Sequence, residues 1–314
     1  MVYLHMLAVF DRETAKAPSG LTTWNTDTSH RAHSPKEDER VEESCRHQLE
    51  RAYSASKPAS RKLELLGHGN GFTFEASPYC SYANEGGVHI LFAGEVGAWP
   101  GVNAVNAAHD AFMRGVPPPE ANDAHWLLDF YRSFFTGGAV EEDADKRALE
   151  SLAQVQGSFA FVIFDELQHR VFAARDGEGA QPLYWGATGE GQLLIGSHLD
   201  DMEECNPTAT HFPAGTLFAS ERHTVAFSPG DRGWVISEGD WPGRLFSFLR
   251  DSDGTHWRGV KAIPRVTSKG YLCGAVYKVA SAQQLPPDGA PGDEEAARAE
   301  RKRRADGATR VHVL

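Results

Sequence analysis

Three neighbouring stretches decide the fold of this chain: Gly157-Ser-Phe-Ala-Phe-Val-Ile-Phe-Asp165, Arg170-Val-Phe-Ala-Ala-Arg-Asp-Gly-Glu-Gly179 and Pro182-Leu-Tyr-Trp-Gly186. The first two predict strands over 158–164 and 170–175 that pair across a turn at 165–169. Both faces of the first strand are apolar, so we expect a sheet that is covered on both sides.

The pattern of strands and helices continues outward from these stretches. Apolar side chains at helical spacing predict helices over 102–112, 122–134 and 143–155, directly before the quoted stretches. Short apolar runs predict strands at 2–10, 63–66, 71–76, 88–93, 183–185, 192–197, 215–219, 224–227 and 271–279.

Three segments lack this periodicity. We interpret about 11–61, with a short helix near Glu37–Arg51, and about 228–258 as insertions into one domain that covers 1–280. Residues 281–314 are rich in Pro, Gly and charge, which predicts a disordered charged tail. Its basic cluster at 298–304 is interleaved with glutamates, which favours a solvated helix over a nuclear-import signal.

Composition narrows the function classes. The 314 residues are 41% hydrophobic and 10% aromatic, which is enough for a sizeable core. The net charge of −12 argues against a nucleic-acid partner, and no stretch is long and apolar enough for a membrane partner. We expect a cytoplasmic protein, with a nuclear location as the alternative. The cysteines are far apart and form no CxxC pair, which predicts reduced thiols and no metal or cofactor: Cys45, Cys80, Cys205 and Cys273.

The quoted stretches resemble the glutaminase domain of asparagine synthetase and the other class-II glutamine amidotransferases. Residues 194–199 and 211–218 resemble two further blocks of that domain. A closer resemblance is to the plant aluminium-induced, or stem-specific, proteins, and it covers most of residues 1–280 from Met6-Leu-Ala-Val-Phe10 onward. Two motifs of that family, YGL and LRDR, are not recognisable, so the chain looks like a divergent member.

This resemblance implies a fold class and a chemistry. The implied fold is α+β, a four-layer αββα sandwich of the N-terminal-nucleophile hydrolase type with mainly antiparallel sheets. A working glutaminase of this type uses a terminal cysteine whose own α-amine is the base, and an Asn-Gly pair supplies oxyanion donors. This chain starts Met1-Val-Tyr-Leu4, and Ala93-Gly94 stands where the resemblance implies the Asn-Gly pair. If Met6 corresponds to the start of the family domain, Leu7 occupies the place of the nucleophile.

Other family positions are partly kept. Glu95 and Asp123 match, but no substrate arginine can be placed, because the expected region reads Gly67-His-Gly-Asn-Gly71. Asp123 is interpreted either as a helix cap or as a group that holds an ammonium ion. We therefore expect no catalytic residue and a vestigial substrate pocket that contains Ala93, Gly94, Glu95 and Asp123.

Two functions follow from these residues. The first is a non-catalytic, stress-responsive binding or regulatory protein, with a small amino acid as its ligand and a homodimer as its assembly. The second is an active amidohydrolase with another nucleophile, such as Cys80 or Cys273. The Gly-rich 67–71 stretch lacks the Lys-Ser/Thr of a phosphate-binding loop, so we interpret it as a turn.

Overall fold

The structure of the protein is a computed structural model. It describes residues 4–12, 14–18, 21, 35–55, 60–100, 123–135, 141–220, 243–252, 254, 256–270 and 272–280. The expected helix at 102–112, the strand at 224–227, the stretch 111–115 that corresponds to the YGL motif and the tail at 281–314 lie outside these residues.

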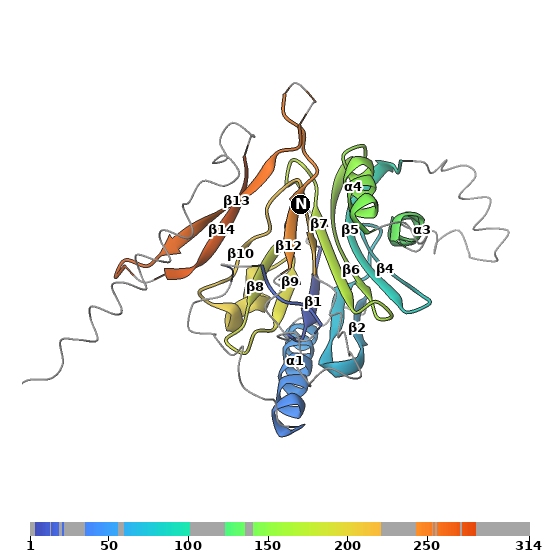
Figure 1. Ribbon diagram of the computed structural model, residues 1–314. Coiled ribbons are helices and arrows are strands. Elements are labelled where there is room, and N and C mark those ends of the chain that lie inside the picture. Colours follow the sequence, from blue (N-terminus) through green and yellow to red (C-terminus); the bar gives the residue numbers. More distant parts are fainter. Residues whose placement is uncertain are drawn as a thin grey trace, which may run out of the picture.

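Two six-stranded sheets face each other (Figure 1). The first sheet has the order β10 (Thr210–His211), β8 (Tyr184–Ala187), β9 (Leu193–Gly196), β1 (Met6–Phe10), β3 (Gly71–Glu75) and β2 (Arg61–Leu65). The second has the order β12 (Arg244–Ser247), β11 (Thr216–Ala219), β7 (Arg170–Arg175), β6 (Gln156–Asp165), β5 (Val88–Ala98) and β4 (Cys80–Glu85). All neighbouring strands in both sheets are antiparallel.

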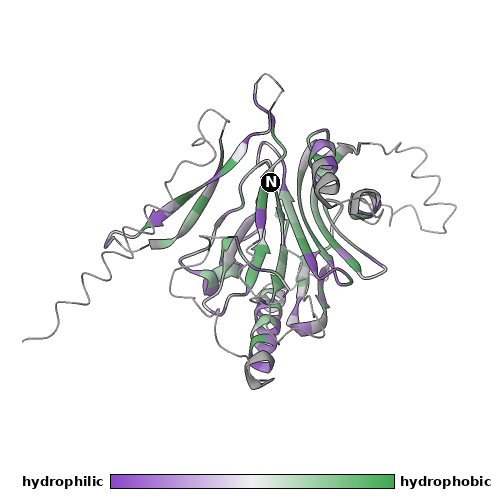
Figure 2. Ribbon diagram, in the orientation of Figure 1, coloured by the Kyte–Doolittle hydropathy of each residue, from purple (hydrophilic) through white to green (hydrophobic). Residues whose placement is uncertain are grey.

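The main core lies between the two sheets. Side chains alternate across a strand, so Met6, Ala8 and Phe10 of β1 point into this core while the residues between them point the other way. The even-numbered residues of β6 from Ala160 to Phe164 meet them from the second sheet. Figure 2 shows hydrophobic residues concentrated in these strands.

Helices cover the outer faces of both sheets. The helix α1 (Pro35–Ala55) contacts β1, β2 and β3, and its Cys45 and Leu49 share a cluster with Leu7 and Val9. The helices α3 (Asp123–Phe135) and α4 (Glu141–Leu152) pack on the second sheet. The expected α+β, four-layer αββα arrangement with antiparallel sheets is thereby confirmed.

The structure differs from the sequence expectations in the two segments interpreted as insertions. In the first, α1 has 21 residues and exceeds the short helix expected at Glu37–Arg51. Val41, Cys45 and Leu49 recur at helical spacing and are buried, but the many charges around them hide the pattern. In the second, β12 extends the second sheet by pairing with β11.

The end of the described chain is a hairpin rather than a single strand. The strands β13 (Gly259–Val266) and β14 (Leu272–Ala280) pair with each other and form a separate ribbon beside the two sheets (Figure 1). Two short 3-10 helices complete the described elements: η1 (Gly67–Gly69) and η3 (Leu199–Cys205). Among the described helices, none has both the length and the apolar character that crossing a membrane requires.

Candidate functional site

A pocket of about 460 Å³ lies beside the N-terminal end of β1. This volume is in the range of small-molecule sites. Both sheets contribute to the pocket, together with the loop between β7 and β8 and the start of η3. The lining residues are Leu4, Tyr79, Glu95, Ser158, Ala180, Gln181, Pro182, Tyr184, Ser197, His198, Leu199 and Asp200.

The Arg-Asp pair that ends β7 builds one wall of this pocket. The Arg175 guanidinium donates hydrogen bonds to the carbonyl oxygens of Gly179 (2.6 Å), Gln181 (2.6 Å) and Phe212 (3.0 Å). The Asp176 carboxylate accepts three backbone N–H groups of the same loop, at 2.9–3.1 Å. The most recognisable motif of the sequence therefore holds a loop in place, and that loop carries lining residues.

Three of the expected site residues lie consecutively on β5, but only Glu95 lines the pocket. Ala93 is buried in the core between the sheets. The N–H of Gly94 donates to the carbonyl oxygen of Tyr79 at 2.8 Å, so this donor is engaged within the fold. Gly94 has φ +127°, and a Cβ there would lie 2.0 Å from the carbonyl oxygen of Ser158, so the close approach of β6 requires glycine.

Asp123, the fourth expected site residue, is the first residue of α3 and is not among the residues that line the pocket. Its Oδ1 accepts a hydrogen bond from the Trp99 indole N–H at 3.2 Å. Burial raises the pKa of the Asp123 carboxyl, and hydrogen bonds from Trp99 and the Val96 backbone partly oppose that rise. Its contacts connect α3 to the end of β5, and its role toward a ligand stays a prediction.

A polar cluster that was not expected from the sequence lies at the N-terminal end of β1. The backbone N–H of Met6 donates to Ser197 Oγ at 3.0 Å, and this hydroxyl lies 2.8 Å from His198 Nδ1. His5, directly before β1, stacks on His198 with ring centroids 5.4 Å apart. Burial lowers the pKa of His198, and His5 lowers it further, so the neutral imidazole is favoured. In the sequence, the one feature that pointed to this cluster was the Ser-His pair at 197–198, within the 194–199 block.

Residues 7–232 match the family described as aluminium-induced protein. The chain belongs to the aluminium-induced protein family.

Relatives outside this family match more weakly. Asparagine synthetase B (glutamine-hydrolysing) of Escherichia coli strain K12 is 35% identical over 72 residues, which are 23% of this chain and 13% of that protein. This aluminium-induced family member thus spans only a small part of the length of that curated relative. The domain of the present chain is class-II glutamine amidotransferase-like, as the sequence predicted.

Two solved structures match with low scores. Glutamine phosphoribosylpyrophosphate amidotransferase from B. subtilis, complexed with ADP and GMP, has a TM-score of 0.37 and 12% identity over 79% of this chain and 50% of that one. A structure described as the allosteric regulatory enzyme of purine biosynthesis has a TM-score of 0.40 and 12% identity over 79% of this chain and 49% of that one.

In this aluminium-induced family member, Leu7 is completely buried on the outer face of the first sheet. It lies inside β1, between Thr73 of β3 and Gly196 of β9. Its cluster includes Cys45 of α1 and Cys205 of η3. The side chain at this position therefore packs against α1 and is not among the residues that line the pocket.

The two cysteines considered as alternative nucleophiles are also buried. Burial raises the pKa of the Cys80 thiol to about 12, and its Sγ lies 3.8 Å from the carbonyl oxygen of His5. Cys273 lies on β14, where its Sγ is 3.6 Å from the carbonyl oxygen of Arg265 in the same hairpin. Neither cysteine lines the pocket.

Proposed function

We propose that this chain is a non-catalytic amidotransferase-like protein that binds a small amino acid in the pocket and has a regulatory role. One observation carries the proposal: the groups at the expected nucleophile and oxyanion-donor positions are engaged in packing and hydrogen bonding within the fold. Leu7 is buried against α1, and the N–H of Gly94 donates to Tyr79 instead of facing a substrate oxygen. An acyl-transfer site needs both a nucleophile and aimed oxyanion donors.

The pocket lining suggests which end of an amino acid is recognised. Its charged groups are the carboxylates of Glu95 and Asp200, together with the titratable His198, and neither arginine nor lysine is among the lining residues. Among the lining residues, the Gln181 amide donates a hydrogen bond to Ser158 Oγ at 3.2 Å, which orients two further polar groups. This arrangement favours the ammonium group of a ligand, since carboxylates stabilise a nearby cation.

Glu95→Gln tests the binding function. It removes one lining carboxylate, whereas Glu50→Gln makes the same change at an exposed position of α1. Thermal-shift and calorimetric titrations with glutamine and asparagine should show saturable binding that weakens about 10-fold in Glu95→Gln and is unchanged in Glu50→Gln. Equal affinities in both variants would place the ligand elsewhere, and no binding by the parent chain would refute the binding function.

A glutaminase assay tests the absence of catalysis in the same samples. We expect ammonia release from glutamine to stay at the background of a buffer control. Turnover that disappears in Cys80→Ala or Cys273→Ala would replace this proposal with an active amidohydrolase that uses that thiol.

A further inference from the structure

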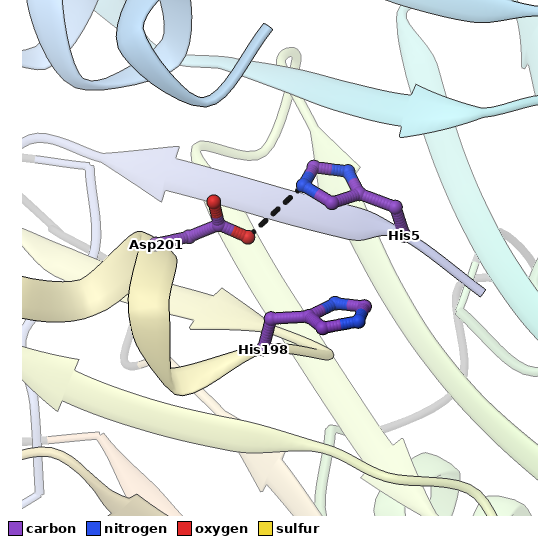
Figure 3. A group of neighbouring side chains, drawn as sticks. All are labelled: His5, His198 and Asp201. Atoms are coloured by element: carbon purple, nitrogen blue, oxygen red, sulfur yellow. Dashed lines mark ion pairs between the residues drawn. The ribbon is translucent and has the colours of Figure 1, made fainter. Parts of the chain in front are cut away.

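Three potential metal ligands gather at the head of β1: His5, His198 and Asp201 (Figure 3). One ligand atom from each lies within 4.8 Å of the others. His5 Nε2 is 3.0 Å from Asp201 Oδ2, and the two imidazole rings stack at an interplanar angle of 23°. His5 lies directly before β1, His198 lies between β9 and η3, and Asp201 lies in η3, so the topology brings together groups that are about 190 positions apart in the chain.

The polar atoms of this cluster are buried and poorly satisfied. The side chains of His5 and Asp201 are only 11% and 10% exposed. Within the part of the chain that the structure describes, His5 Nδ1 and Asp201 Oδ2 have no hydrogen-bond partner, so the 3.0 Å contact is close without being aligned as a hydrogen bond. Leaving such groups buried and unsatisfied costs free energy, and a cation bound between His5 Nε2 and Asp201 Oδ2 would offset this cost at the carboxylate oxygen.

Neighbouring groups prepare His198 as a ligand. Ser197 Oγ lies 2.8 Å from its Nδ1, and the backbone N–H of Met6 fixes that hydroxyl from the other side. A metal-binding imidazole characteristically uses its second ring nitrogen for a hydrogen bond of this kind, which sets the tautomer and the ring orientation.

We propose that His5, His198 and Asp201 form a binding site for one divalent transition-metal ion, with Zn²⁺ as the ion that fits this set best. Two imidazoles and one carboxylate are typical of zinc sites that keep one position open. Bonds of about 2.0–2.2 Å in a tetrahedral site require ligand atoms about 3.4 Å apart. The pair of His5 Nε2 and Asp201 Oδ2, at 3.0 Å, is already within that separation, and the third ligand atom lies within 4.8 Å of both, so it would have to move closer when the ion binds.

The ion would lie at the wall of the pocket, because His198 and Asp200 line it. Its open position is then a place where an amine or carboxylate of a bound molecule can coordinate. The metal site itself does not depend on that ligand, so it can be tested without it.

The test uses the full chain, stripped with a chelator and titrated with Zn²⁺ against a competing chromophoric chelator. We expect one tightly held ion per chain. His198→Ala and Asp201→Asn should each weaken Zn²⁺ binding at least 10-fold, because each removes a ligand. His47→Ala, which removes an exposed histidine of α1, is the matched control and should bind as the parent does. Co²⁺ in place of Zn²⁺ should give the visible absorption of a tetrahedral site in the parent and lose it in Asp201→Asn.

Two results would overturn the site. One is the absence of a stoichiometric ion in the parent chain. The other is equal affinity in Asp201→Asn, His198→Ala and His47→Ala, which would assign the binding to scattered surface histidines. Asp201→Asn keeps the shape of the side chain, so it carries the test if circular dichroism shows that His198→Ala does not fold.

Discussion

Leu7→Cys puts a thiol at the position that the sequence resemblance assigns to the glutaminase nucleophile, and we expect it to produce no glutaminase activity. The new thiol would lie in the cluster that already holds Cys45 and Cys205. Burial raises the pKa of each of these two thiols to about 12. With the same pKa, only about one thiol in 10⁵ is ionised at pH 7, compared with a few per cent of a free cysteine. Because the thiolate is the attacking species, this environment alone removes about three orders of magnitude of reactivity.

The exchange should also destabilise the fold. Leu7 is completely buried, and truncating a buried leucine to alanine costs about 2–5 kcal/mol, so the smaller truncation to cysteine should cost about 1–3 kcal/mol. Denaturant unfolding measures this loss, and an ammonia assay with glutamine measures activity.

Thiol labelling of the native variant checks the assumed environment. All four native cysteines are buried, so the folded parent should react slowly with a thiol reagent and Leu7→Cys should add no fast-reacting group. A rapidly labelled fifth thiol, or ammonia release above the parent level, would contradict the placement of this side chain against α1.

Three further changes test the contacts around the pocket. Gly94→Ala places a Cβ 2.0 Å from a carbonyl oxygen of β6 and should cost about 3 kcal/mol or more in urea unfolding, whereas Gly97→Ala, whose nearest neighbour would be 3.7 Å away, should cost much less. Burial raises the pKa of Asp123, so the contribution of this carboxyl to stability is fully present below the unfolded pKa of about 3.8 and declines as pH rises through the folded pKa. Asp123→Asn keeps an oxygen that can accept the hydrogen bond from the Trp99 indole, so it should flatten this part of the stability–pH curve. Asp123→Ala loses that hydrogen bond and should destabilise the protein at every pH. Arg175→Lys loses the fork that reaches three carbonyl oxygens and should cost about 2–4 kcal/mol and weaken amino-acid binding, as calorimetry would show.

Much of the fold was predictable because its strands are strongly apolar. The pairing of β6 with β7 across the 165–169 turn follows from two apolar runs separated by polar residues. The full length of α1 was not predictable in the same way, since charged residues outnumber the few buried positions on one side of that helix. The extra strand β12 was missed because it is short, and its place depends on pairing with β11.

The candidate site was only partly predictable. Glu95 follows a strong strand within a recognisable block, so its place near a pocket could be expected. His5, His198 and Asp201 form no motif, because their proximity depends on the pairing of β1 with β9 and on the turn into η3. Metal-ligand spacing can be read from a sequence only when the ligands share a local element.

The retained amidotransferase-like residues have structural tasks that do not depend on catalysis. Gly94 and Gly157 let β5 and β6 approach each other, because a Cβ at either position would lie within 2.3 Å of a backbone oxygen of the other strand. Arg175 and Asp176 hold the loop that forms the pocket wall. By contrast, Leu7, which the resemblance assigns to the nucleophile position, contributes packing against α1 that a catalytic thiol facing a substrate could not supply. These contacts keep the pocket whether or not the chain catalyses a reaction, which is why binding is the property that we expect experiments to find.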